Sequence, residues 1–212
     1  MIYKFSALIV ALTMSFSVWM PAATAATVAS RGPEQVVTTT VQAIIKILNH
    51  RQDKKHLNEH DRQQIRAILE GNFNFREMAR HSMGPPWRQL DDAHRNEFVS
   101  MFRQIMEYTY GNRLSGYHGQ TIAYNHAEFR RNKARIQSRV TDGSTITPVD
   151  YLLKKSSAGW LVYDIKIEGV SMINTFRQDF SGVIDHKGID GFFQALHKKV
   201  AALIAKDQST NG

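Results

Sequence analysis

Histidine is the side chain in this sequence best suited to metal binding or proton transfer. The chain has nine histidines, and His56 and His60 are separated by one helical turn, a spacing that two zinc ligands on a helix can adopt. No HExxH motif and no third ligand accompany this pair. The pair also lies in or beside a polar stretch, where exposure to solvent is the simpler interpretation. The sequence therefore predicts no metal site.

Two pairs of neighbouring aspartate and tyrosine residues offer a second kind of chemistry. Asp150 precedes Tyr151, and Tyr163 precedes Asp164. Enzymes of the ketosteroid isomerase type place an aspartate base and a tyrosine donor in one apolar pocket. Neighbouring residues of a strand point to opposite faces of a sheet, so neither pair can act as a unit. Tyr151 and Asp164 can still meet across two strands, and an isomerase-like enzyme is the alternative hypothesis.

Other catalytic signatures are absent from the sequence. It contains no GxSxG, Walker A or GxGxxG motif. It also contains no cysteine, which excludes a disulfide framework, thiol catalysis and cysteine-ligated metals. We therefore expect no catalytic residue and no cofactor.

Residues 1–25 have the pattern of a secretory signal peptide. A basic residue near the start is followed by a short uncharged apolar run and then by Ala23 and Ala25, which suit signal peptidase. The apolar run is shorter than the roughly 20 residues that a membrane span needs, which favours cleavage near Ala25 over a retained anchor. We expect an exported, periplasmic protein whose mature chain, residues 26–212, is a single domain.

The chain is basic, with a formal net charge of +8. Such a charge suits nucleic acid, anionic lipid headgroups or an acidic protein partner. Export argues against nucleic acid. The basic pairs are also scattered along the chain, at residues 54–55, 130–131, 154–155 and 198–199. Solvated surfaces that aid solubility are one interpretation of this pattern, and attraction to membranes or to an acidic docking partner is the main alternative.

Apolar residues at helical spacing predict helices before and after a central strand region. The first helices are expected over 33–49, over a second segment that Asp61 caps and Gly71 ends, and over a short segment that ends at Gly84. A long helix from about Ala93 to Leu114, capped by Asp91 or Asp92, follows them. Beyond the strands, a helix with Ile173 and Ile184 is expected to end at Lys187-Gly188, and a further helix follows.

The middle of the chain has the alternation and turns of an antiparallel sheet. Strands are predicted over 121–124, 128–141, 145–155 and 160–168, with turn-forming residues between them. Helices, then strands, then helices indicate an α+β fold, with helices packed on one face of a curved antiparallel sheet of four strands. Gly169 is expected to allow the sharp turn from strand to helix, and Glu168 or Ser171 to cap the helix that follows.

Several short segments carry a resemblance to a known family. They are Met83-Gly84 with Trp87, Tyr110-Gly111, the run 117–120, Tyr163-Asp164, the run 168–171 and the run 187–191. In order and spacing these segments resemble the MlaC/Ttg2D family of periplasmic phospholipid carriers, also called toluene-tolerance auxiliary proteins. The resemblance covers nearly all of the mature chain.

This resemblance implies a twisted four-stranded antiparallel sheet whose helices enclose a deep apolar cavity for lipid tails. It implies a carrier that takes phospholipid between an outer-membrane Mla lipoprotein complex and an inner-membrane Mla-type ABC transporter, and so maintains outer-membrane lipid asymmetry. Related auxiliary proteins sit beside hopanoid-synthesis systems, so a hopanoid or another hydrophobic molecule is the alternative cargo. Direction of transport and the docking surface are not implied.

Candidate cavity residues are chosen from the apolar faces of the predicted elements. Aromatic and methionine residues at helical spacing suit a packed core and also a pocket for fluid acyl chains, and the resemblance favours the pocket. The candidates are Phe98, Phe102, Ile105, Met106, Val149, Tyr151, Leu153, Tyr163, Ile165, Ile167, Val170 and Ile173. The choice assumes which strand face is concave; the opposite parity would place Leu152, Trp160 and Val162 there instead.

Overall fold

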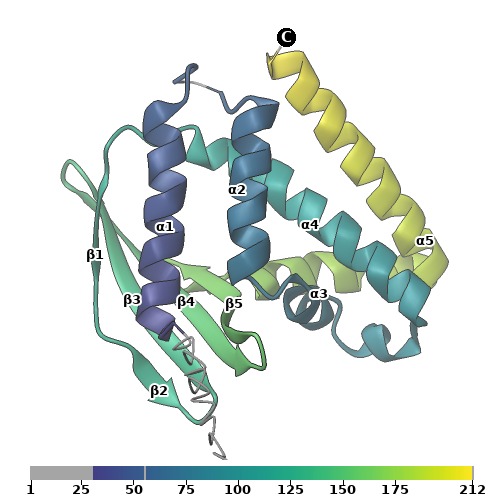
Figure 1. The fold of residues 1–212 in the computed structure, drawn as a ribbon. Helices are drawn as coiled ribbons and strands as arrows, with labels where there is room; N and C mark the ends of the chain where they lie inside the picture. Colours follow the sequence, from purple (N-terminus) through teal and green to yellow (C-terminus); the bar gives the residue numbers. More distant parts are fainter. Residues whose placement is uncertain (1–30, 55, 212) are drawn as a thin grey trace, which may run out of the picture.

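The computed structural model describes residues 31–54 and 56–211, and within them the chain has an α+β fold (Figure 1). The predicted signal peptide, residues 1–25, lies outside the described residues. The elements in chain order are α1 (Pro33–His50), α2 (Glu59–Asn72), α3 (Phe75–Met83), the 3-10 helix η1 (Pro85–Gln89), α4 (Asp92–Leu114), β1 (Thr121–Tyr124), β2 (Glu128–Arg130), β3 (Lys133–Asp142), β4 (Thr145–Ser156), β5 (Gly159–Ile167), β6 (Val170–Ser171) and α5 (Met172–Asn211).

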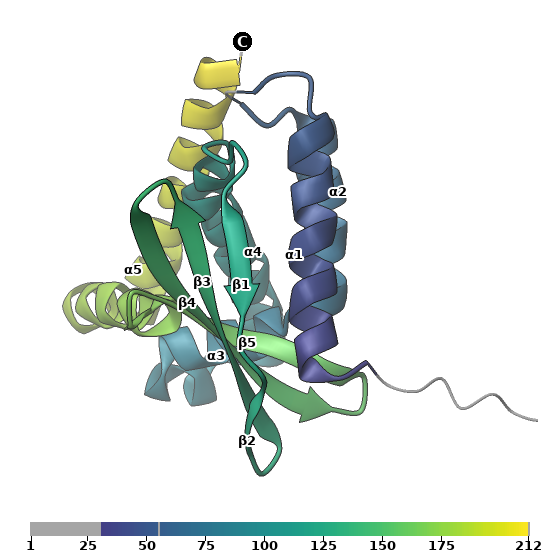
Figure 2. The same ribbon diagram turned by 90° about the vertical axis from the view of Figure 1, so that its left-hand side faces the viewer.

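The sheet is antiparallel, as expected, but the described residues form six strands rather than four. The strand order is β1-β3-β4-β5-β6, and β2 also pairs with β3. The predicted strand 128–141 divides into β2 and β3 because Arg131 adopts a left-handed conformation, with φ of 56°, and turns the chain back on itself. β1 and β2 both pair with β3, so together they form one interrupted edge (Figure 2).

The turn after β5 produces the sixth strand. Glu168 and Gly169 both have positive φ, 52° and 81°, and the tight turn pairs Val170 with Ile167. Gly169 therefore provides the sharp turn that the sequence predicts. Ser171 then caps α5, since its Oγ accepts a hydrogen bond of 3.0 Å from the backbone N–H of Asn174.

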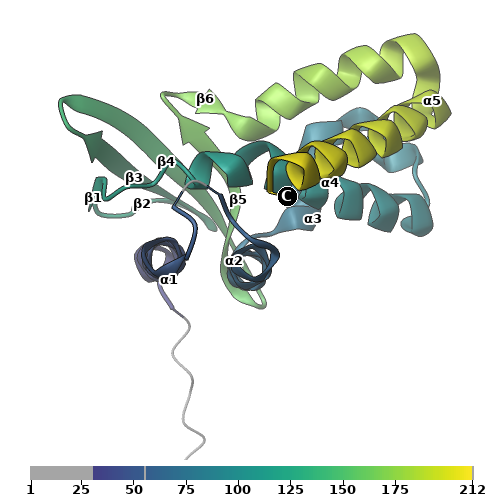
Figure 3. The same cartoon turned by 90° about the horizontal axis from the view of Figure 1, so that it is seen from above.

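Helices α1 and α2 lie side by side across one face of the curved sheet (Figure 3). Pro33 occupies the first turn of α1, where its missing N–H costs nothing. Val36 and Val37 of α1 are buried against Ile136 and Leu153 of the sheet. The apolar face of α1 therefore fixes this helix against the sheet.

The helix starts agree only in part with the sequence prediction. Asp91 caps α4 as expected, with its side chain accepting from the N–H of His94. Asn58 rather than Asp61 caps α2, because the helix begins earlier and the Asn58 side chain accepts from the N–H of Asp61. Asp61 therefore lies within the first turn of α2.

The remaining helices build a second layer beyond β5, and an aromatic core fills it. α5 bends at Gly188, whose φ of 68° and ψ of −177° are not helical, and this confirms the predicted helix end. After the bend, the second half of α5 rises away from the first half towards the C-terminus (Figure 1). Rings of Phe98, Phe176, Phe180 and Phe192 pack with centroids 5.3–5.7 Å apart. No helix among the described residues is long and apolar enough to cross a membrane.

Candidate functional site

A cavity of about 730 Å³ lies between the sheet and helices α1, α2 and α4. Most of its lining is apolar. The apolar residues that line it are Val37, Val41, Ile44, Ile45, Leu48, Leu57, Ile65, Leu69, Phe73, Phe75, Met106, Tyr110, Leu114, Tyr117, Ile122, Val140, Val149, Tyr151, Val162, Ile165, Ile167 and Met172. An apolar hollow of this size suits a ligand with long hydrocarbon chains.

The sheet lines this cavity with one face of β4 and β5, and a bulge sets which residues that face presents. Ile165 pairs with Tyr151, but Val162 pairs with Leu153, so β5 holds one extra residue in this interval. The extra residue shifts the alternation, and Ile165 and Val162 therefore share the cavity face. Tyr163 lies outside the lining, with its ring 6.0 Å from that of His81.

Five of the candidate residues line the cavity, and contact of any of them with a ligand remains a prediction. They are Met106, Val149, Tyr151, Ile165 and Ile167. Val149 and Tyr151 share one face of β4, and Ile165 and Ile167 share the same face of β5. Met106 of α4 also lines the cavity.

The other candidates lie elsewhere. Phe98, Phe102, Ile105 and Ile173 belong to the aromatic core, and Leu153 is buried with Ile136 below the cavity. Val170 is 63% exposed on β6, and Tyr163 lies at the bulge. Of the residues given for the opposite parity, Val162 lines the cavity, whereas Leu152 and Trp160 do not.

Helices α1 and α2 supply cavity residues that the candidate list lacks. Val41, Ile44 and Ile45 of α1 face the cavity, and so does Leu69 of α2. The helical spacing of these apolar residues identifies their helix faces in the sequence. That spacing does not reveal that the faces stop short of the sheet and leave a hollow.

Tyr151 and Asp164, the two residues of the isomerase-like alternative, lie on opposite faces of the sheet. Tyr151 faces the cavity, whereas Asp164 pairs with Leu152 and so points to the other face of the sheet. The Asp164 carboxylate accepts hydrogen bonds from Ser171 Oγ, at 2.6 Å, and from the N–H of Ile173, at 3.3 Å. Asp164 thus holds the start of α5 and does not meet Tyr151.

Burial also affects the tyrosines of this region. Desolvation raises the pKa of Tyr151 well above its usual value, and it raises the pKa of Tyr124 to about 12. Both phenols are therefore neutral at physiological pH. Of the two, Tyr151 lines the cavity.

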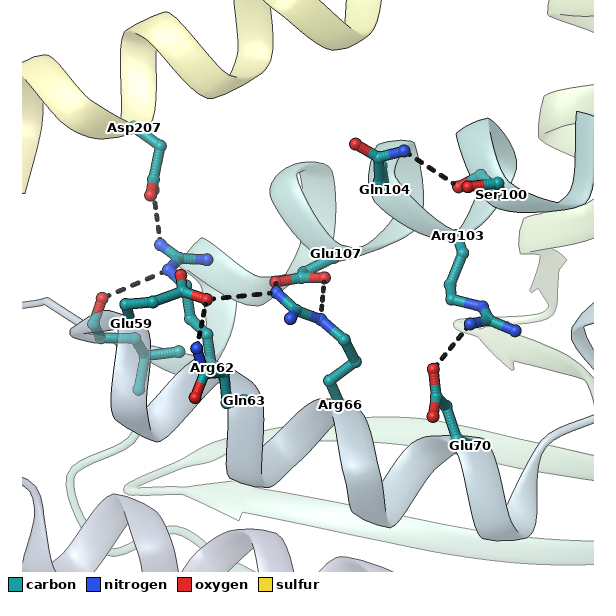
Figure 4. Close-up of polar contacts among 11 residues, drawn as sticks. Glu59, Arg62, Gln63, Arg66, Glu70, Ser100, Arg103, Gln104, Glu107 and Asp207 are labelled. Carbon is teal, nitrogen blue, oxygen red and sulfur yellow. Dashed lines mark hydrogen bonds and ion pairs between the residues drawn. The ribbon is translucent and has the colours of Figure 1, made fainter. Parts of the chain in front are cut away.

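Charged side chains bridge the side of the cavity between α2 and α4 (Figure 4). Arg66 of α2 donates to Glu107 of α4 at 2.7 Å, and Arg103 of α4 donates to Glu70 of α2 at 2.6 Å. Arg62 reaches Asp207 near the end of α5. Each of these arginines lines the cavity, and each has a carboxylate partner. The charges of these three arginines are therefore compensated, whereas Arg113, which also lines the cavity, lies over the ring of Tyr110.

Among the described residues, no group of three or more histidine and carboxylate side chains is placed to hold a metal ion. His56 contacts Asp53 at 2.9 Å, and His60 contacts the Gln64 side chain at 2.7 Å. The two histidines thus have separate local partners.

Comparisons with known proteins agree on one family. The sequence profile described as "MlaC protein" matches residues 38–198. The intermembrane phospholipid transport system binding protein MlaC of Haemophilus influenzae is 21% identical over 177 residues, which cover 79% of this chain and 83% of that protein. Toluene tolerance protein ttg2D of Pseudomonas putida is 26% identical over 105 residues, about half of each chain.

A solved structure has the same fold. The phospholipid-binding protein from Ralstonia solanacearum, determined in complex with a phospholipid, superposes with a TM-score of 0.74 and 25% sequence identity. The match covers 80% of this chain and 97% of that chain. The arrangement of helices around the sheet described above is therefore shared with that protein.

Proposed function

The chain belongs to the MlaC family, and we propose that it carries phospholipid with the acyl chains held in the cavity between the sheet and α1, α2 and α4. The observation that supports this proposal most strongly is the mostly apolar cavity of about 730 Å³. The family match, the name of the Haemophilus relative and the lipid complex of the Ralstonia protein support the same function.

The physical reason for such a cavity is the cost of exposing hydrocarbon to water. Each methylene exposed costs about 0.8 kcal/mol, so the two chains of a phospholipid cannot cross an aqueous space unshielded. The cavity supplies the shield, while a charged headgroup stays near water. A carrier of this kind needs neither a catalytic residue nor a cofactor, and we assign none to this chain.

The proposed place of this carrier is the periplasm. Residues 1–25 act as the export signal, and residues 26–212 form the mature carrier. It receives and delivers phospholipid at an outer-membrane Mla lipoprotein complex and an inner-membrane Mla-type ABC transporter, and it thereby maintains outer-membrane lipid asymmetry. The name of the Haemophilus relative, an intermembrane phospholipid transport system binding protein, supports this assignment.

Transfer of a fluorescent phospholipid between donor and acceptor vesicles tests the proposal. The wild-type protein should accelerate transfer. Val149→Trp places an indole in the cavity and should abolish most of the acceleration, whereas Val170→Trp changes an exposed residue of β6 and should have no effect. Thermal unfolding of both variants controls for misfolding.

Two results would count against the proposal. Unchanged transfer by Val149→Trp would mean that the acyl chains lie elsewhere, and no acceleration by the wild type would remove the carrier function. If a hopanoid is transferred and a diacyl phospholipid is not, the protein is a carrier for the alternative cargo.

A further inference from the structure

A second, smaller pocket adjoins the apolar cavity at the end where α1 and α4 finish. Its volume is about 660 Å³, and it is lined by Leu48, Asn49, Arg51, Lys54, Ser115, Gly116, Tyr117 and His118. Leu48, Gly116 and Tyr117 also line the apolar cavity, so the two spaces share part of their walls. In Figure 1 this end lies at the top, where the loop leaves α1. We call it the rim pocket.

The rim pocket differs from the cavity wall in its charge. Arg51 and Lys54 line it, and no residue of its lining carries a carboxylate. Neither of these cations forms an ion pair with a carboxylate within residues 31–54 and 56–211. The arginines between α2 and α4, by contrast, all have acidic partners. Uncompensated positive charge therefore lies at the rim.

Among the described residues, the hydrogen-bond partners of the buried Arg51 side chain are all carbonyl groups. Its side chain donates to the backbone carbonyls of Lys54 at 2.6 Å, Ser115 at 2.7 Å, Tyr117 at 3.0 Å and Leu114 at 3.2 Å. The residue is 4% exposed, and its Nε has no hydrogen-bond acceptor among the described residues. Carbonyl dipoles do not cancel a full charge, so Arg51 maintains a positive potential in the adjoining pocket.

Lys54 supplies the contact that buried Arg51 cannot make. Its ammonium donates one hydrogen bond, of 2.8 Å, to the carbonyl of Asn49 and is partly free in solvent. An ammonium has three donors, so donors remain for an anion in the pocket. The buried charge of Arg51 and the exposed ammonium of Lys54 together suit the binding of a phosphate monoanion.

We propose that the rim pocket binds the phosphate of the cargo's headgroup, with Lys54 in contact and Arg51 as the source of the field. This inference rests on the proposed carrier function, because it places the headgroup where the rim pocket adjoins the acyl-chain cavity. It adds a preference: a lipid with a phosphate should bind more tightly than a neutral lipid with the same chains.

Fluorescence titration with two acyl-labelled lipids of matched chains, phosphatidylglycerol and diacylglycerol, tests this preference. For the wild type we expect phosphatidylglycerol to bind about tenfold more tightly, which is about 1.4 kcal/mol. Lys54→Glu should remove this preference and leave the affinity for diacylglycerol unchanged. Lys46→Glu makes the same charge change at an exposed site on α1 outside both pockets, and it should behave as wild type.

The outcomes distinguish this inference from the carrier function. Equal binding of both lipids by the wild type, or an unchanged preference in Lys54→Glu, would overturn the rim-pocket inference and leave the carrier intact. Failure of the wild type to bind either lipid would overturn both. Displacement of phosphatidylglycerol by inorganic phosphate at equimolar concentration would show a site for free phosphate, and it would overturn the headgroup assignment.

Discussion

Two apolar regions of the molecule differ in packing. The aromatic core between α3, α4 and α5 is closely packed, whereas the region between the sheet and α1 and α2 contains a cavity. In the core, rings such as Phe98 and Phe180 meet edge to face and are buried. In the cavity, aliphatic side chains such as Ile44 and Ile165 border open space. Apolar composition alone therefore does not separate a packed core from a ligand cavity.

The difference arises from what holds the walls apart. α4 lies against α5 through large rings, whereas α2 and α4 are also tied by Arg66 with Glu107 and by Arg103 with Glu70. Ion pairs of long side chains span a gap that short aliphatic side chains do not fill. The curved sheet, bulged at Tyr163, completes the hollow.

The largest expected effect tests the packed half of this comparison. Phe98→Ala removes a fully buried ring from the core and should lower the free energy of unfolding by about 3–5 kcal/mol. Ile44→Ala, in the cavity wall, should cost only about 1 kcal/mol, because its side chain already borders open space. Urea denaturation measures both values. Equal losses would mean that the two regions do not differ in packing.

A somewhat smaller effect is expected at the rim of the cavity. Arg51→Met leaves the carbonyls of Leu114, Ser115 and Tyr117 without their donor and should destabilise the protein by about 2–4 kcal/mol. Arg113→Met, at the exposed end of α4, should change stability by about 0.5 kcal/mol or less. Thermal unfolding compares the two variants, and a harmless Arg51→Met would show that this residue does not hold the rim.

A third prediction concerns the ion pair between Glu77 of α3 and Lys154 of β4. Hydrogen bonds from Arg80 and then Lys154 lower the pKa of Glu77 from 4.5 to about 2, although burial opposes them. Because the folded pKa is depressed, the ionised carboxylate stabilises the fold above about pH 4.5, and this contribution is lost as the pH falls towards about 2.

Urea denaturation of the wild type and Glu77→Gln as a function of pH measures this contribution. The wild type should be the more stable protein above pH 4.5, and the difference should shrink below it. A difference that does not vary with pH would show that the charge of Glu77 is not what joins α3 to β4.

The smallest effect is expected at His118, which lines the rim pocket. The carbonyl of Gly116 and the charge of Asp142 raise the pKa of His118 above its usual 6.5. The stabilisation by the protonated imidazole is therefore fully present below about pH 6.5, and it is lost as the pH rises through the higher pKa of His118 in the folded protein. NMR titration should give a pKa above 6.5, and Asp142→Asn should lower it. A pKa at or below 6.5 in the wild type would contradict this placement.

Local signals made much of the fold predictable. The order of helices and strands, the cap at Asp91 and the helix end at Gly188 all follow from residue type and spacing. The sequence does not reveal the division of 128–141, because Arg131 takes a left-handed conformation that few residues other than glycine adopt. The sequence does not fix the start of α2, because both Asn58 and Asp61 can cap a helix.

The cavity was less predictable than the fold. Phe98 and Met106 lie on the same apolar face of α4, yet one is core and the other lines the cavity. Sequence periodicity cannot tell how far along a helix its packing partner extends. Tyr163 lies outside the cavity lining because a bulge reverses the alternation, and no residue pattern marks that bulge in the sequence.

Native mass spectrometry of the purified protein tests the central claim most directly. Organic extraction and lipid analysis would then identify whatever is bound. The account predicts a diacyl phospholipid at a stoichiometry near one per protein molecule. A protein that stays empty even after incubation with phospholipid vesicles would contradict it.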